Sequence, residues 1–185
     1  SYLLGPIGGN LVSQGFNNLI GLQNGFSFKS LAISVLSTAV TGGVKFNAFG
    51  ATASDFLQTV GNAAVNGAAS SAITQGIATV TGLQESFSWA GVAAAGVAAG
   101  VGARLGRGLT DFTAAGGLTA GNIAAHTAVG AASLIASAAT RSAIEGSSFG
   151  ANIRAGLPDV IGQVLGRALV GAVQGGGSAK VEESP

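Results

Sequence analysis

Apolar runs alternate with short polar connections along this chain. At two places the same connection occurs: an apolar run ends near a glycine, the tripeptide GLQ follows, and a Phe-Ser-aromatic triplet opens the next run. Apolar runs of this length and composition indicate helices rather than strands. They predict helices at residues 8–20, 28–41, 52–80, 89–104, 118–145 and 158–173.

Three of these helices contain residues that oppose the assignment. The segment 31–44 has four isoleucine and valine residues, which also suit a strand, but its counterpart 92–102 is too rich in alanine and glycine for one. We therefore expect a helix in both. Helix 52–80 includes three glycines, each less favourable than alanine by about 1 kcal/mol. Pro158 fits a first helical turn and would break a helix interior, so the last helix is expected to begin there.

A sixteen-residue passage occurs twice. Segments 13–28 and 74–89 align without a gap at a spacing of 61 residues and share seven identical residues. Self-similarity at a long fixed period indicates a repeated supersecondary unit, here helix–loop–helix. A third, looser copy with a shorter loop contains Ser142-Ala143-Ile144 and Ser148-Phe149.

The serines of these connections are predicted helix caps. Ser27 and Ser88 stand where a side-chain oxygen accepts a hydrogen bond from an unpaired backbone N–H of the next turn. Ser148 holds the matching position in the third copy. A phenylalanine before each of the first two caps has a leucine or valine five residues later, which is the spacing of a hydrophobic staple.

Glycines four residues apart predict close helix packing. The pairs are Gly96 and Gly100, Gly102 and Gly106, and Gly162 and Gly166. Each pair lies on one helix face and lets another backbone approach, as in membrane helix pairs. The same spacing also suits tight packing inside a soluble core of alanine and glycine.

Composition narrows the function classes. The 185 residues include 32 glycines, only 8% charged residues, no cysteine and a net charge of +1. An ordered chain is expected, with a tendency to associate and neither a disulfide nor a nucleic-acid site. We predict one all-α domain over 1–177, made of repeated Gly/Ala-rich helical hairpins packed through small residues. Its repeats cover about 8–44, 69–105 and, more weakly, 130–173, and a polar tail at 178–185 acts as a linker.

Two segments are nearly apolar enough to span a bilayer. Residues 86–103 carry no charge between Glu85 and Arg104, and a longer charge-free run lies between Asp111 and Arg141. A span needs around 20 predominantly apolar residues. Serine, glycine and threonine weaken both segments, which favours insertion as a packed hairpin over a permanent span.

Catalytic chemistry finds little support. His126 is the only histidine and no cysteine accompanies it, which argues against a zinc site. A triad with Asp111 or Asp159 lacks a G-x-S-x-G elbow. We therefore expect His126 to be structural, and expect no catalytic, cofactor or metal residue. An enzyme would need a pocket that brings His126 together with a carboxylate.

The passages TQGIATVTGLQESFSWAGVAAAGVAAGVGARLG and ASLIASAATRSAIEGSSFGANIRAGLPDVIGQVLG resemble a module of very large exported bacterial proteins. These are filamentous-haemagglutinin-like adhesins, contact-dependent inhibition proteins and Rhs-type polymorphic toxins. The resemblance covers about 60–175 and part of 10–45. It implies a Gly/Ala-rich pre-toxin region between a stalk or shell and a C-terminal toxin, and it transfers no catalytic residue.

Two functions follow as expectations. The first is a non-enzymatic, translocation-associated region of a secreted or cell-surface protein, whose partners are its own flanking domains, itself or a target membrane. No small-molecule substrate is evident. The alternative is a structural spacer or self-assembly module. Amides that form satisfied networks in a compact core would favour the spacer, whereas an exposed apolar belt would favour the membrane. The amides in question belong to Gln14, Asn17, Asn62, Asn66 and Gln75.

Overall fold

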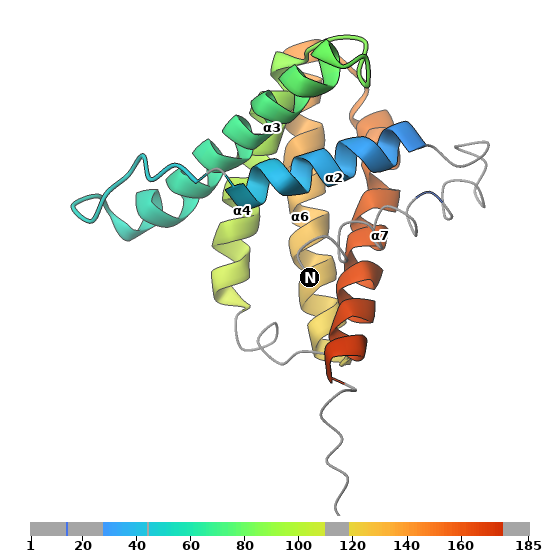
Figure 1. The fold of residues 1–185 in the computed structure, drawn as a ribbon. Helices are drawn as coiled ribbons and strands as arrows, with labels where there is room; N and C mark the ends of the chain where they lie inside the picture. The colour runs from blue at the N-terminus through green and yellow to red at the C-terminus, as the bar shows by residue number, and fades with distance from the viewer. Residues whose placement is uncertain (1–13, 15–27, 44, 110–118, 176–185) are drawn as a thin grey trace, which may run out of the picture.

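A computed structural model describes residue 14 and residues 28–43, 45–109 and 119–175, where every regular element is a helix (Figure 1). The all-α prediction is confirmed for this part of the chain. The elements are α2 (Phe28–Gly43), the π-helical turn η1 (Leu57–Gly61), α3 (Asn62–Val80), α4 (Trp89–Gly108), α6 (Ala120–Glu145) and α7 (Phe149–Gly175).

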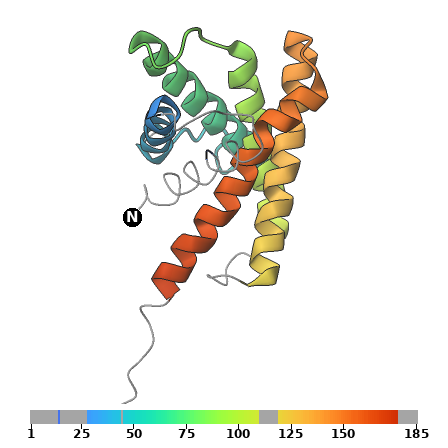
Figure 2. The same ribbon diagram turned by 90° about the vertical axis from the view of Figure 1, so that its right-hand side faces the viewer.

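The described helices form an open row. Helix α3 packs on α2 and α4, α4 packs on α3 and α6, and α6 packs on α4 and α7. The turn η1 packs on α3 and α4, and no other pair of the described elements is in contact. Figures 1 and 2 show α4, α6 and α7 side by side, with α3 rising to one end of the row and α2 lying across it. Because the row does not close into a bundle, each helix leaves part of its surface uncovered.

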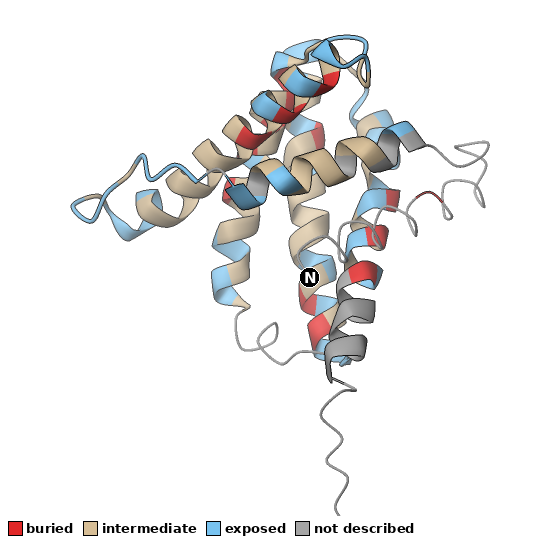
Figure 3. Ribbon diagram, in the orientation of Figure 1, coloured by how far each residue is buried: buried red, intermediate tan, exposed pale blue. Residues whose placement is uncertain are grey.

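Few residues of the described chain are buried (Figure 3). Apart from Pro158, the buried apolar side chains there are all alanines: Ala78, Ala90, Ala94, Ala125 and Ala138. Larger apolar side chains are exposed instead, among them Val80 at 89% and Trp89 at 74%. The backbones therefore approach closely, while little large apolar surface is removed from water.

Most helix boundaries agree with the predictions. The two differences are a π-helical turn within segment 52–80 and the start of α7. The segment 31–43 is helical, so the strand alternative is wrong there. Segment 52–80 contains the π-helical turn, whose first amide, that of Leu57, donates to the Ser54 hydroxyl at 3.4 Å. The predicted helix 8–20 is described only at Gln14, which is helical and buried. Ser27, Asn17 and the tail 178–185 lie outside the described residues.

The prediction that the last helix begins at Pro158 is wrong. Helix α7 begins at Phe149, and Pro158 lies in its interior with less than 2% of its surface exposed. Proline removes a hydrogen bond and clashes with the preceding turn, which costs about 3 kcal/mol in a helix interior. The complete burial of its ring against neighbouring residues offsets part of that cost. Rules that consider only the local sequence do not include this stabilisation by burial.

Candidate functional site

In the part of the chain that the structure describes, helices α4 and α6 are long and apolar enough, by length and composition alone, to cross a membrane. They have 20 and 26 residues and pack against each other. In the most apolar 18-residue window of each helix, 33% of α4 is buried but only 11% of α6. In a soluble core the most apolar helix is normally the best covered. Here α6 is both long and apolar, yet few of its residues are fully buried by the described chain, and most are half-buried or exposed.

Backbone contact joins α4 to α3. A methyl group added at Gly96 would lie 3.0 Å from the carbonyl oxygen of Ala64. One added at Gly100 would lie 3.2 Å from a methyl of Val60 in η1 and 3.5 Å from Ala64 Cβ in α3. From the α3 side, a methyl at Gly67 would lie 2.6 Å from Ala99 Cβ, closer than side-chain carbons approach. These three glycines leave no room for larger residues between the helices.

The other predicted packing glycines differ in whether another helix lies against them. A methyl at Gly102 would lie 3.0 Å from the Ser133 hydroxyl on α6, so this glycine faces the α4–α6 contact. A methyl at Gly106 would meet no described atom within 4 Å. Gly162 and Gly166 are buried in α7. Glycine spacing along one helix therefore locates a helix face without showing which positions another helix touches.

A reciprocal contact between α6 and α7 was not predicted. A methyl at Gly130 would lie 2.8 Å from Val160 Cγ1, and one at Gly156 would clash with Leu134. Leu134 stands four residues after Gly130 and covers Gly156. In the same way, Val160 stands four residues after Gly156 and covers Gly130. The sequence search paired glycine with glycine, whereas this contact pairs glycine with a larger residue across two helices. A search for Gly-x-x-x-Leu or Gly-x-x-x-Val would have found it.

The repeated passage forms the corner between α3 and α4. The side-chain oxygen of Gln75 accepts hydrogen bonds from the Ser88 amide at 2.8 Å and from the Gln84 side chain at 3.1 Å. Its nitrogen donates to Ser71 at 3.0 Å. Gly82 takes the left-handed conformation, with φ of 73°, just after α3 ends. In the second copy, residues that are identical in both copies thus fix the turn, and the first copy lies outside the described residues apart from Gln14.

Ser88 is the N-cap residue of α4. Its hydroxyl accepts a hydrogen bond from the Gly91 amide at 2.9 Å and donates to Glu145 at 3.1 Å. Glu145 is the last residue of α6, so this bond links the α3–α4 corner to the α6–α7 corner. Ser148 precedes α7, and the Ala151 amide donates to its hydroxyl at 3.4 Å. The two corners lie at the same end of the helix row (Figure 1).

Two asparagines hold an extended segment against α3. The Asn66 side chain accepts from the Phe46 amide at 2.6 Å and donates to the Phe46 carbonyl at 2.7 Å. Asn62 makes the same pair of bonds with Phe49, both at 2.9 Å. Each side-chain amide therefore satisfies a backbone donor and acceptor that no sheet supplies. No sequence pattern indicated this contact, because it depends on how segment 45–49 folds back onto α3.

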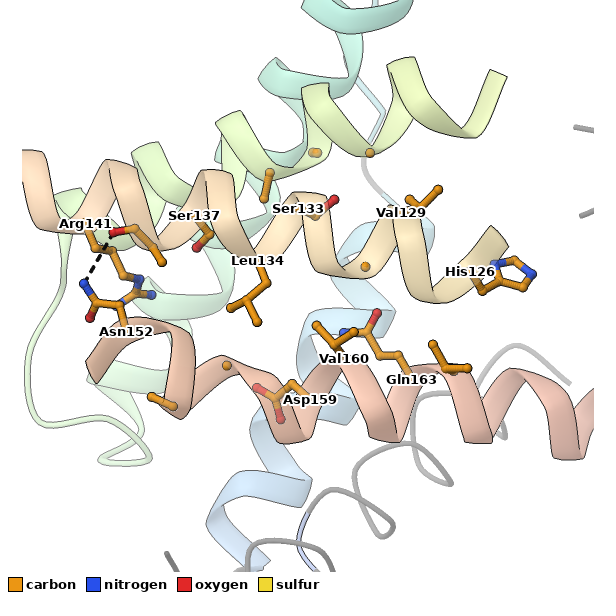
Figure 4. Close-up of a pocket in the computed structure, with 18 of the residues that line it drawn as sticks. His126, Val129, Ser133, Leu134, Ser137, Arg141, Asn152, Asp159, Val160 and Gln163 are labelled. Atoms are coloured by element: carbon orange, nitrogen blue, oxygen red, sulfur yellow. Dashed lines mark hydrogen bonds between the residues drawn. The ribbon is translucent and has the colours of Figure 1, made fainter. Parts of the chain in front are cut away.

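A cavity of about 810 Å³ lies along α6 between α4 and α7, and both His126 and Asp159 line it (Figure 4). Ser133 and Ser137 also line it, so the groups required for a triad share one cavity. Figure 4 shows the His126 ring at one end of the cavity, pointing away from Asp159.

Comparison with protein-family models, with curated proteins and with solved structures found no match to this chain.

Proposed function

We propose that this chain is a non-enzymatic, translocation-associated region of a secreted bacterial toxin or adhesin, built from repeated Gly/Ala-rich helical hairpins that contact a target membrane. One observation carries the proposal. Helix α6 is long and apolar enough to cross a bilayer, packs beside a second such helix, and has only 11% of its most apolar window buried. The resemblance of the passages 74–106 and 132–166 to exported bacterial proteins supplies the biological setting.

The contacts between the helices suit transfer into lipid. Lipid chains are as apolar as leucine, so association of helices in a bilayer depends on close packing rather than on the hydrophobic effect. Gly102 faces Ser133 across the α4–α6 contact without an intervening large side chain. Large apolar residues such as Val97 and Ile135 are exposed at 43% and 53%. The pair can thus keep its contact while its outer surface exchanges water for lipid.

The alternative is a structural spacer or self-assembly module, and the amide networks favour it. The side chains of Gln75, Asn62 and Asn66 are hydrogen-bonded within the protein, at a corner and along an extended segment. Gln14 is buried and also has a partner. Such bonds give a fixed shape, which a spacer requires and a delivery device does not.

Molar mass and lipid binding distinguish the two functions. The chain is purified without detergent, its mass is measured by light scattering, and flotation and dye-leakage assays follow with liposomes at neutral and acidic pH. The membrane function predicts flotation, and leakage at one pH at least. A monodisperse species that ignores liposomes at both pH values contradicts it and supports the spacer, whose stoichiometry then shows whether it assembles.

A charge on α6 sharpens the test. Ile135→Lys places a lysine in the middle of α6, where insertion into a bilayer is disfavoured by about 3 kcal/mol relative to an apolar residue. Ile135 is 53% exposed, so the folded protein should tolerate the change. Phe56→Lys is the control, since Phe56 is 58% exposed and precedes η1, outside the α4–α6 pair. The proposal requires that the first variant lose liposome flotation and the control keep it.

A further inference from the structure

A second cavity, of about 710 Å³, lies between α2, α3, α4 and the end of α6. Its volume is within the range of small-molecule sites. Ten of the fifteen described residues that line it have polar side chains, and none is a carboxylate. Two cations, Lys45 and Arg141, line it in a chain that has only eight lysines and arginines. The cavity is therefore polar and positive within an otherwise apolar, nearly neutral protein.

Part of the polar lining is already used by the fold. Asn66 binds the Phe46 backbone, and Gln75 binds Ser88 and Gln84 at the corner. These groups form one rigid side of the cavity. They have little capacity left for a ligand, so the groups that matter for binding are those the fold does not use.

Four donors in the lining have no partner among the described residues: Lys45, Ser70, Thr74 and Arg141. Ser70 is 8% exposed and Thr74 is 6% exposed, and the Thr74 hydroxyl is completely buried without a hydrogen bond. A buried hydroxyl without a partner costs about 1–3 kcal/mol. Arg141 is half-buried, and a guanidinium presents five N–H donors. The Thr74 hydroxyl lies below the cavity surface, so Lys45, Ser70 and Arg141 are the groups that can donate to an acceptor-rich ligand.

The carboxylate one turn along the same helix does not neutralise Arg141. Glu145 is one turn further along α6, but it accepts a hydrogen bond from Ser88, and no atom pair between it and Arg141 is within ion-pair distance. An arginine that precedes a glutamate by four residues has the less favourable order for a helical pair. Arg141 lines both this cavity and the one along α6 (Figure 4), and its positive charge has no ion-pair partner among the described residues.

We propose that this cavity binds the phosphate group of a phosphate ester, with Arg141 as the charged anchor and Ser70 as a hydroxyl donor. The donors come from α3, α6 and the segment that follows α2, so they approach from different directions. A tetrahedral phosphate presents oxygens in several directions, whereas a carboxylate presents two in one plane. Arginine pairs with phosphate through two parallel hydrogen bonds. The inference does not depend on the proposed membrane function.

The test measures binding to the whole chain by titration calorimetry and by thermal unfolding. The probes are inorganic phosphate and glycerol phosphate, each compared with chloride at equal ionic strength. Arg141→Gln should weaken phosphate binding about 10- to 100-fold, since a hydrogen bond to a charged group is worth about 1.5–3 kcal/mol. Arg104→Gln is the control with the same charge change, because Arg104 is exposed and does not line this cavity. It should bind like wild type.

Ser70→Ala is the second variant, in case Arg141→Gln does not fold, and it should weaken binding about 5- to 10-fold. Flotation with phosphatidic acid vesicles and with phosphatidylcholine vesicles identifies the source of the phosphate. Saturable binding of glycerol phosphate assigns a soluble ester, and Arg141-dependent flotation confined to phosphatidic acid assigns a lipid headgroup. The absence of both, or binding that Arg141→Gln and Ser70→Ala leave unchanged, overturns the proposal. Flotation on phosphatidylcholine bears only on the membrane function.

Discussion

Replacing Gly67 with alanine tests whether backbone contact holds α3 against α4. The added methyl would lie 2.6 Å from Ala99 Cβ and 2.7 Å from the Ala95 carbonyl oxygen. Both neighbours belong to the α4 backbone or its first side-chain atom, so neither can rotate away. The helices must separate by several tenths of an ångström, and the hydrogen-bonded corner at Gln75 limits that movement.

The expected magnitude comes from two opposing effects. Overpacking a close contact costs about 1–3 kcal/mol, while alanine favours a helix over glycine by about 1 kcal/mol. Gly76 lies in the same helix and has no described atom within 4 Å of an added methyl, so only the second effect applies there. Gly76→Ala should therefore raise the free energy of unfolding, and Gly67→Ala should be less stable than Gly76→Ala by about 1–3 kcal/mol.

The assay is urea and thermal unfolding of both variants, followed by circular dichroism of the helical signal. For a chain of this length, each kcal/mol corresponds to about 2–4 °C in Tm. The two variants add the same methyl group to the same helix, and they differ only in the atoms that lie around it. If Gly67→Ala is as stable as Gly76→Ala, the close α3–α4 contact does not exist in solution.

Three further changes test the corner and the surface by the same unfolding assay. Gln75→Ala removes an oxygen that accepts from two donors and should cost about 1–3 kcal/mol, whereas exposed Gln163→Ala should change little. If the two variants lower the free energy of unfolding equally, the hydrogen bonds of Gln75 do not stabilise the corner. Gly82→Ala must adopt φ of 73° and should cost about 1–2 kcal/mol; a neutral result would mean that this turn does not need a left-handed residue. Asp55→Asn breaks the exposed pair with Arg107 and should cost less than about 1 kcal/mol, and a larger loss would show that this surface pair holds η1 to α4.

The helical segments were predictable because their signals lie within one or two turns. Ser88 is followed by the amide that it caps, and the bond from Gly91 closes over three residues. Gly82 ends α3 locally for the same reason, since only glycine takes that conformation without strain. The repeated passage also pointed to the α3–α4 corner, because its identical residues make short-range bonds there.

The cavities and most glycine contacts were not predictable, because they depend on the register between helices far apart in sequence. Gly106 has the same motif spacing as Gly102, yet only Gly102 faces α6 among the described residues. The contact of Gly130 with Val160 needs α6 and α7 placed at one particular offset. Arg141 was a scattered charge in the sequence and became a cavity residue only when α2, α3 and α4 surrounded it.

The sequence by itself determined that this chain is helical, where its corners lie, and that its charges are few. Those properties follow from capping, glycine conformation and composition, which act between near neighbours. Only the tertiary structure decided that few residues of α6 are fully buried and that Pro158 lies inside a helix. It also decided that the Asn62 and Asn66 side chains bind an extended segment. Each of these features depends on which surfaces pack together. The free energy of that packing comes from contacts between segments that are far apart in the sequence.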